Sequence, residues 1–230
     1  MNILDIGALA QSEALANGSL TARALMEATL ERIDAVNGAV NAIVALRPRA
    51  ELLAEADRAD ATPRVGWLHG IPIAIKDLSD AKGLPTAKGS PLFAGTIAQK
   101  DSVFVARIRA AGAIIIGKTN TPEFGLGSHT FNPVYGPTRN PYDHTRSAGG
   151  SSGEAAAALA TGMLSIADGS DMMGSLRNPA GWNNVYGMRP SWGTVPPEPE
   201  GDMFLHQLSM AGPMARCPRD LAALLDTMTG

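Results

Sequence analysis

The stretch AGGSSGEAAAALATGMLSIADGSDMMGSLRNPAG, residues 148–181, decides the fold. Its alanine-rich first half predicts a helix over 154–162, because alanine has the highest intrinsic helix propensity. The apolar run that follows predicts a strand over 163–167. Glycine-flanked serines stand at both ends of this unit, Ser151 before the helix and Ser175 after the strand.

The same alternation of helices and strands extends outward over the rest of the chain. The pattern predicts further helices over 20–36, 47–60, 101–111 and 220–228, and further strands over 41–46, 71–75 and 113–116. Residues 20–36 place Leu25, Leu30 and Ile33 on one face, after a capping candidate at Ser19 or Thr21. Strands separated by helices predict an α/β fold with at least a partly parallel sheet.

The composition is that of a globular protein with a sizeable core. The 230 residues are 45% hydrophobic and 18% charged, and the net charge of −3 gives no electrostatic basis for binding nucleic acid or an anionic membrane. No apolar run approaches the roughly 18 residues of a membrane span, and Asp5 and Glu13 lie where a signal peptide would be basic and then apolar. The single cysteine, Cys217, cannot form an internal disulfide, which indicates a cytoplasmic protein.

Residues 112–119, GAIIIGKT, match the phosphate-binding pattern of nucleotide hydrolases letter by letter. That pattern works only where it follows a strand and opens a helix, and here a predicted helix precedes Gly112. The residues between the two glycines are one alanine and three isoleucines, which favour a buried strand. We therefore interpret Gly112 as a helix cap. The histidines show no metal-ligand spacing, so we expect no metal and no cofactor.

Ser151, Ser175 and Lys76 are the candidate catalytic residues. A serine hydroxyl is a poor nucleophile until a base takes its proton, and a Ser–Lys pairing is a known alternative to Ser–His–Asp. Lys76 ends the predicted β-branched strand over 71–75. Burial at such a position lowers the pKa of a lysine from its ordinary value of about 10.4 and lets it act as a base.

These residues lie in motifs that resemble those of the amidase signature family of serine hydrolases. The motifs are HGIPIAIKD around Lys76, GKTNTPEFGLGS from Gly117, GPTRNP from Gly136 and the stretch over 148–181, in the order and spacing of the family. The resemblance extends from about Leu20 to the closing GPMARCPRDLAALLDTMTG. It implies a mixed, largely parallel central sheet flanked by helices, and cleavage of amide carbon–nitrogen bonds in a small-molecule substrate. It also implies that 1–230 is one domain, the N-terminal portion of a longer one, with 1–65 mainly helical.

The resemblance implies a role for each candidate residue. Ser175 would be the nucleophile that forms an acyl-enzyme, and Ser151, preceded by a cis peptide bond, would pass the proton of Ser175 on to Lys76. Backbone amides of Met172, Met173 and Gly174 would stabilise the oxyanion.

Gly125 and Ser128 would border the acyl pocket by the same resemblance. We expect Ser152 to cap the following helix, and Asp171 and Arg177 either to support the site or simply to stabilise the loop as an ion pair.

The chain departs from the family at two positions, because most members have glycine where Met173 and Glu154 stand. Methionine tolerates a positive φ poorly, so the oxyanion loop would be reshaped, and Met173 would either narrow the pocket or fill the core. Most members are also much longer. A non-catalytic remnant or interaction module therefore stays open beside the amidase, as does an amidotransferase subunit that releases ammonia from glutamine. Exposed strand edges favour a homo-oligomer or a complementing C-terminal polypeptide.

Overall fold

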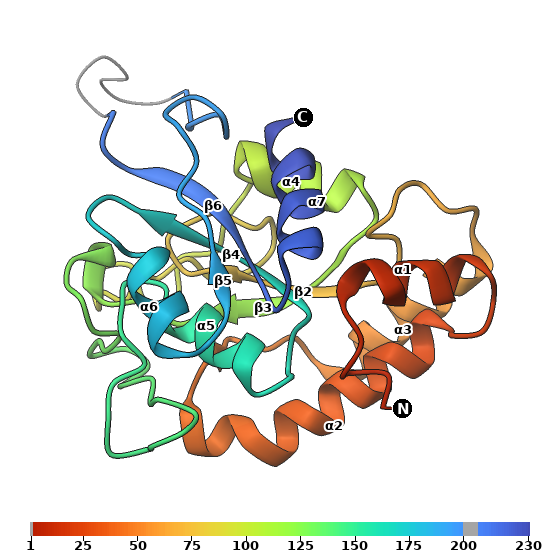
Figure 1. The fold of residues 1–230 in the computed structure, drawn as a ribbon, viewed down its shortest axis with the longest axis horizontal. Coiled ribbons are helices and arrows are strands. Elements are labelled where there is room, and N and C mark those ends of the chain that lie inside the picture. The colour runs from red at the N-terminus through yellow and green to blue at the C-terminus, as the bar shows by residue number, and fades with distance from the viewer. Residues whose placement is uncertain (1, 200–206) are drawn as a thin grey trace.

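The computed structural model describes residues 2–199 and 207–230. Two three-stranded sheets lie at its centre, with the strand orders β1-β3-β2 and β4-β6-β5 (Figure 1). The strands are β1 (Ile43–Val44), β2 (Pro72–Lys76), β3 (Ile114–Thr119), β4 (Ile166–Asp171), β5 (Tyr186–Gly187) and β6 (Met210–Ala215). The helices are α1 (Ala8–Ala16), α2 (Ala22–Val40), α3 (Arg49–Ala61), α4 (Val103–Ala110), α5 (Gly153–Ala160), α6 (Arg177–Trp182) and α7 (Pro218–Thr229), with a 3₁₀ turn, η1 (Glu123–Gly125).

The fold is α/β with mixed sheets, as expected, but its parallel share is smaller than the sequence pattern suggests. The pair β2 and β3 is parallel, with α4 in the crossover between them. The pairs β1–β3, β4–β6 and β5–β6 are antiparallel. The physical reason is the connection: β5 reaches β6 without a helix between them, and a connection of that kind can reverse the chain direction.

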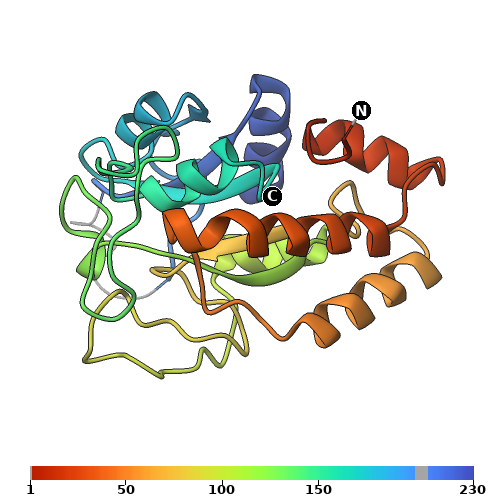
Figure 2. The same cartoon turned by 90° about the horizontal axis from the view of Figure 1, so that it is seen from below.

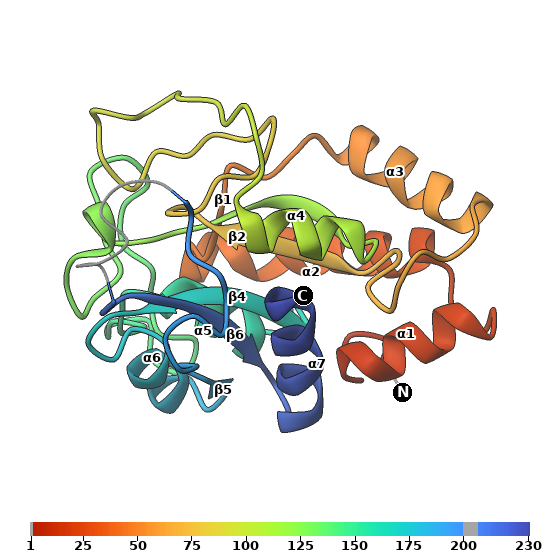
Figure 3. The same cartoon turned by 90° about the horizontal axis from the view of Figure 1, so that it is seen from above.

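Strands β2 and β4 lie side by side where the two sheets meet (Figures 1 and 3). The backbone amide of Lys76 donates to the Asp168 carboxylate at 3.0 Å across this boundary. The last residue of β2 and the second half of β4 are therefore held together, which brings Lys76 close to the residues on either side of α5.

Both faces of the central strands are buried, and they pack against different helices. Successive side chains of a strand point to opposite faces. Ala74, Ile114 and Ile116 belong to a core cluster with α2, α3 and α5, and Figure 2 shows α2 lying across the strands. Ile75 and Ile115 belong to a second cluster with α1, α4 and α7 (Figure 3). Strands covered on both faces are typical of α/β proteins, and they place the carboxyl end of β2 in the interior.

The predicted helices and strands are present with shifted ends. The helix predicted over 20–36 is α2, and the Thr21 hydroxyl caps it by accepting from the Ala24 amide at 3.1 Å. The strand predicted over 163–167 begins later, at Ile166, because the amides of Met163 and Leu164 donate back to the Ala158 carbonyl of α5. The sequence pattern does not indicate α1, α6, β5 or β6.

Residues 112–119 form the end of a helix and a buried strand instead of a phosphate-binding loop. Gly112 follows α4 with φ +95°, and its amide donates to the Arg109 carbonyl at 2.9 Å, as expected for a helix cap. Gly117 lies in β3 against β1, where an added Cβ would lie 2.9 Å from the Ala45 carbonyl oxygen. This glycine is therefore explained by close strand packing.

Candidate active site

Lys76 is the centre of a buried cluster of hydroxyl groups. It is the last residue of β2 and is 1% exposed. Its Nζ donates to Ser151 Oγ at 2.9 Å, to Ser152 Oγ at 2.8 Å and to Ser170 Oγ at 3.4 Å. The structure thus brings together the lysine and the bridging serine that the sequence predicts. Ser170, at the end of β4, is an additional partner that only the strand boundary could have indicated.

The environment of Lys76 favours its neutral form. Burial is the largest effect and lowers the pKa of the amine, whereas the carboxyl groups of Glu154, Asp168 and Asp171 act in the opposite direction. The net pKa lies below the ordinary lysine value. An amine that is neutral and surrounded by hydroxyls can accept a proton from one of them.

The segment that carries Ser151 fits tightly against a neighbouring loop. The peptide bond between Gly150 and Ser151 is cis, as the resemblance implies. A Cβ added at Gly150 would lie 2.7 Å from the His129 amide nitrogen and 2.9 Å from the Ser128 carbonyl carbon, so only glycine fits there. The loop over 128–129 therefore fixes the backbone from which the Ser151 side chain projects.

Ser152 does not cap α5, which corrects the expectation from the sequence. Its hydroxyl makes no capping bond and instead contacts Lys76, accepts from the Ser170 amide at 3.2 Å and donates to the Ser170 carbonyl at 3.3 Å. Thr130, from the neighbouring loop, accepts from the Gly153 amide at 3.2 Å in its place. The buried amine of Lys76 needs hydroxyl partners more than the helix needs this one, because a second hydroxyl is available to the helix.

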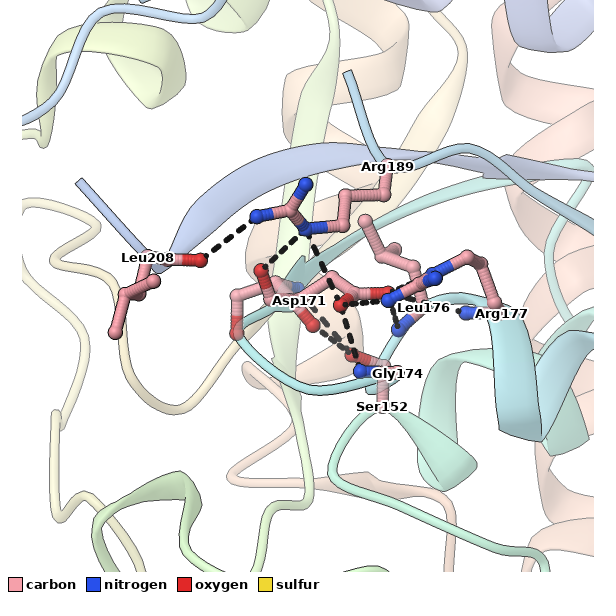
Figure 4. A network of polar contacts seen from close by, with 8 residues as sticks. Ser152, Asp171, Gly174, Leu176, Arg177, Arg189 and Leu208 are labelled. Carbon is pink, nitrogen blue, oxygen red and sulfur yellow. Dashed lines mark hydrogen bonds and ion pairs between the residues drawn. The ribbon is translucent and has the colours of Figure 1, made fainter. Parts of the chain in front are cut away.

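Ser175 lies in a turn that begins at the buried carboxylate of Asp171. The Ser175 carbonyl accepts from the Ser152 amide at 3.1 Å, which ties the two serine segments together. Asp171 accepts from the amides of Gly174 at 2.7 Å and Leu176 at 3.1 Å, on either side of Ser175 (Figure 4). One carboxylate therefore sets the backbone conformation on both sides of the candidate nucleophile.

Two arginines complete the network around Asp171. Arg177 donates through Nε and Nη2, both at 3.0 Å, and Arg189 Nε lies 3.5 Å away (Figure 4). Burial alone would raise the pKa of Asp171, but the bonds from Arg177 and the two loop amides outweigh it, so the pKa lies below the ordinary value. The ion pair predicted from the sequence is present, and it also shapes the turn that carries Ser175.

The amides predicted to form the oxyanion site are not equivalent. The Gly174 amide is taken up by Asp171, so it does not point to a substrate, which corrects the expectation. The amides of Met172 and Met173 have no acceptor within the part of the chain that the structure describes. The positive φ of the turn, +122°, falls on Gly174, and Met173 is not among the described non-glycine residues with positive φ. Met173 is 87% exposed, so it does not fill the core.

Gly125 and Ser128 lie on the loops that face the serine segment. Gly125 packs against Leu78, where an added Cβ would lie 2.6 Å from Leu78 Cδ1, and Ser128 lies against Gly150. Neither residue lines the cavity of about 220 Å³ that reaches the cluster at Ser170. The other walls of that cavity include Leu78, Phe104, Trp192, Val195 and Met210.

No group of three or more histidine, cysteine, aspartate or glutamate side chains is arranged to bind a metal in residues 2–199 and 207–230. Over the same residues, no helix combines the length and the apolar composition needed to cross a membrane.

Known proteins with similar sequences and structures are amide-bond enzymes. The amidase family model matches residues 24–230. An acylamidase of Rhodococcus erythropolis is 40% identical over 100% of this chain and 48% of its own length. The glutamyl-tRNA(Gln) amidotransferase of Sulfolobus acidocaldarius has a subunit that is 39% identical over 95% of this chain and 45% of the length of that subunit.

Among solved structures, 6-aminohexanoate cyclic dimer hydrolase superimposes with a TM-score of 0.91 at 34% identity, over 100% of this chain and 47% of that one. This chain thus spans about half the length of the relatives that it matches. The match of the family model to most of the chain, together with this close agreement in fold, means that the chain belongs to the amidase signature family.

Proposed function

We propose that this chain carries the catalytic residues of an amide hydrolase that works through a covalent acyl-enzyme. The observation that carries the proposal is the hydrogen bond from the buried Nζ of Lys76 to Ser151 Oγ, at 2.9 Å, in a site that lowers the pKa of the amine. The turn over 171–176, which is bonded to the Ser151–Ser152 segment, supports the assignment of Ser175 as the nucleophile.

In the proposed reaction, Ser175 Oγ attacks the carbonyl carbon of the substrate amide. Its proton passes to Ser151 Oγ, and the proton of Ser151 passes to Lys76 Nζ. When the tetrahedral intermediate collapses, the carbon–nitrogen bond breaks and the relay returns a proton to the leaving nitrogen. Water then attacks the ester of Ser175 by the reverse route and releases the carboxylic acid.

The oxyanion would be stabilised by the amides of Met172 and Met173, which have no acceptor among the described residues. This assignment differs from the sequence-based one, because the Gly174 amide is bonded to Asp171. A small-molecule amide is the expected substrate, and the single free cysteine, Cys217, is in keeping with a cytoplasmic location.

A fluorophosphonate probe tests this function, because it labels only an activated serine. We expect labelling of the wild type, loss of labelling in Ser175→Ala, and labelling slowed by about 10²- to 10⁴-fold in Ser151→Ala and Lys76→Met. Ser19→Ala, at an exposed site, is the control and should label normally. Labelling that survives Ser175→Ala would refute the assignment, and a wild type that never reacts would favour the non-catalytic remnant or interaction module.

A second candidate is one component of an amidotransferase, which would release ammonia from glutamine for a partner. The observation that favours it is the 39% identity to the matching subunit of the Sulfolobus acidocaldarius glutamyl-tRNA(Gln) amidotransferase. Ammonia release from glutamine that depends on a co-purifying subunit would support this candidate. Hydrolysis of simple amides by the purified chain, alone, as a homo-oligomer or with a complementing C-terminal polypeptide, would support the amidase.

A further inference from the structure

Glu154 is a buried carboxyl group with very few hydrogen-bond donors. It lies in the first turn of α5 and is 0% exposed. Its Oε2 lies 3.0 Å from Thr130 Oγ1, and its Oε1 is buried without a partner among the described residues. The family resemblance gives no reason for an acidic side chain here, because most members have glycine at this position.

Comparison with Asp171 shows what Glu154 lacks. Both carboxyl groups belong to residues that are 0% exposed. Asp171 is surrounded by loop amides and two guanidinium groups, all of which donate to it. Glu154 has a single hydroxyl, from Thr130. Burying a carboxylate is costly unless donors replace its water, so Asp171 is suited to the charged form and Glu154 to the neutral form.

The hydrogen-bond geometry at Thr130 Oγ1 also fits a neutral Glu154. This oxygen lies 3.0 Å from the Gly149 carbonyl, 3.0 Å from Glu154 Oε2 and 3.2 Å from the Gly153 amide. Thr130 has one hydroxyl proton, so it can donate to only one of the two acceptors. If Glu154 carries its own proton, it donates to Thr130, Thr130 donates to Gly149, and each close contact around this oxygen becomes a hydrogen bond.

The charged groups that face Glu154 do not replace the missing donors. Burial raises the pKa of Glu154 to about 8, Lys76 at the end of β2 opposes this shift, and Asp168 in β4 adds to it. From α6, Arg177 is bonded to Asp171. Strand β6 contributes no titratable side chain, and the ring of His129, next to Thr130, is bonded to Ser147.

We propose that Glu154 is a positioning residue that works as a neutral carboxylic acid. It donates its proton to Thr130 Oγ1, which in turn donates to the Gly149 carbonyl and so holds the backbone that leads into Ser151. In the neutral form it also places no negative charge near Lys76. Only the consequence for acylation rests on the proposed function, because the protonation state of Glu154 is a property of the fold.

Loss of the Glu154 proton would disturb the site in two ways. The carboxylate would draw the Thr130 proton away from Gly149 and loosen the segment before Ser151. Its negative charge would also raise the pKa of Lys76 and favour the ammonium form, which cannot act as a base. Both effects predict a reversible loss of serine reactivity as pH rises through the pKa of Glu154.

The first test measures the proton directly and needs no activity. In protein labelled with ¹³C at the glutamate carboxyl carbons, NMR should show one resonance that keeps its protonated shift at pH 7, titrates near pH 8 and disappears in Glu154→Gln. If Glu154→Gln fails to fold, the same resonance is assigned in the wild type by its shift in Thr130→Ser. A Glu154 resonance that titrates near pH 4 or 5 overturns the proposal.

The second test follows the rate of fluorophosphonate labelling against pH. Above about pH 8 the wild-type rate should fall, approaching tenfold per pH unit, whereas Glu154→Gln, which is neutral and can still donate to Thr130, should not fall. Asp220→Asn is the control: it removes another buried carboxyl, one that caps α1 through the Ala8 amide at 2.7 Å, and should follow the wild type. Equal falls in wild type and Glu154→Gln overturn the proposal. If no variant labels, the proposed function fails and the NMR titration still decides the state of Glu154.

Discussion

Replacing Asp171 by asparagine should destabilise the turn that carries Ser175. The substitution keeps the shape but removes the charge, one acceptor oxygen and its place among the donors of Gly174, Leu176 and Arg177. A hydrogen bond from a buried amide to a charged acceptor contributes about 1.5–3 kcal/mol, and the remaining asparagine oxygen can keep one such bond in weaker form. Counting only the two loop amides, we expect the free energy of unfolding to fall by about 2–4 kcal/mol. The half-exposed guanidinium of Arg177 is left out because water can replace its partner.

Urea denaturation of wild type and Asp171→Asn at pH 7 measures this loss, and Asp143→Asn is the matched control. Asp143 is also paired with an arginine, Arg146, at 2.9 Å, but on the exposed surface, so its substitution should leave the unfolding free energy unchanged. The pKa of Asp171 lies below its ordinary value, so its contribution is complete above about pH 4 and is lost as pH falls further. The difference between wild type and Asp171→Asn should therefore shrink in acid. Equal stability of the two aspartate variants, or a difference that does not change in acid, would refute this reasoning.

Further predictions concern the backbone and the base. Gly150→Ala should lower the unfolding free energy by about 1–3 kcal/mol in thermal or urea denaturation, because its Cβ would overlap the backbone of His129, whereas Gly181→Ala, with open space around it, should cost nothing. The stability of wild type relative to Lys76→Met should rise between neutral pH and about pH 10.4, since the lysine of the unfolded chain keeps its proton over that range and the buried one does not; a flat difference would contradict a lowered pKa. Met173→Gly should change the rate of fluorophosphonate labelling while lowering stability by less than about 1 kcal/mol, because the side chain is 87% exposed; a large loss of stability would mean that Met173 is packed after all.

Elements whose residues are uniform in character could be predicted from the sequence. The alanine-rich α5 and the isoleucine-rich β2 and β3 have one clear preference each, and the structure confirms them. Strand β6 could not be predicted in this way, because Gly212 and Pro213 interrupt its sequence. Its central place in the β4-β6-β5 sheet comes from pairing with strands on both sides, which is information that a local pattern does not contain.

The site shows the same division between local and non-local information. Motif spacing was enough to predict that Lys76 and Ser151 meet. The roles of Ser152, Gly174 and Thr130 depend on which donor and acceptor lie opposite each other after folding. A serine before a helix is ordinarily a cap, and only the presence of a buried amine that needs hydroxyl partners changes its role. For this reason the sequence predicted the residues of the cluster better than their hydrogen bonds.

The two buried lysines of the chain show why one of them is suited to proton transfer. Lys118, in β3, donates to the Ser79 carbonyl at 2.6 Å and lies 3.7 Å from Asp77 Oδ1, and both of these groups only accept hydrogen bonds while Asp77 is ionised. Burial lowers the pKa of Lys118 too, but Asp77 opposes that shift directly. Lys76 has only hydroxyl partners among the described residues, and no carboxylate lies within 4.0 Å of its Nζ there. Its nearby carboxyl groups are occupied elsewhere: Asp168 by the Lys76 backbone amide, Asp171 by the nucleophile turn and Glu154 by Thr130. A hydroxyl can donate to a neutral amine or accept from an ammonium, so this surrounding accommodates both forms of Lys76, which a base in a proton relay must adopt in turn.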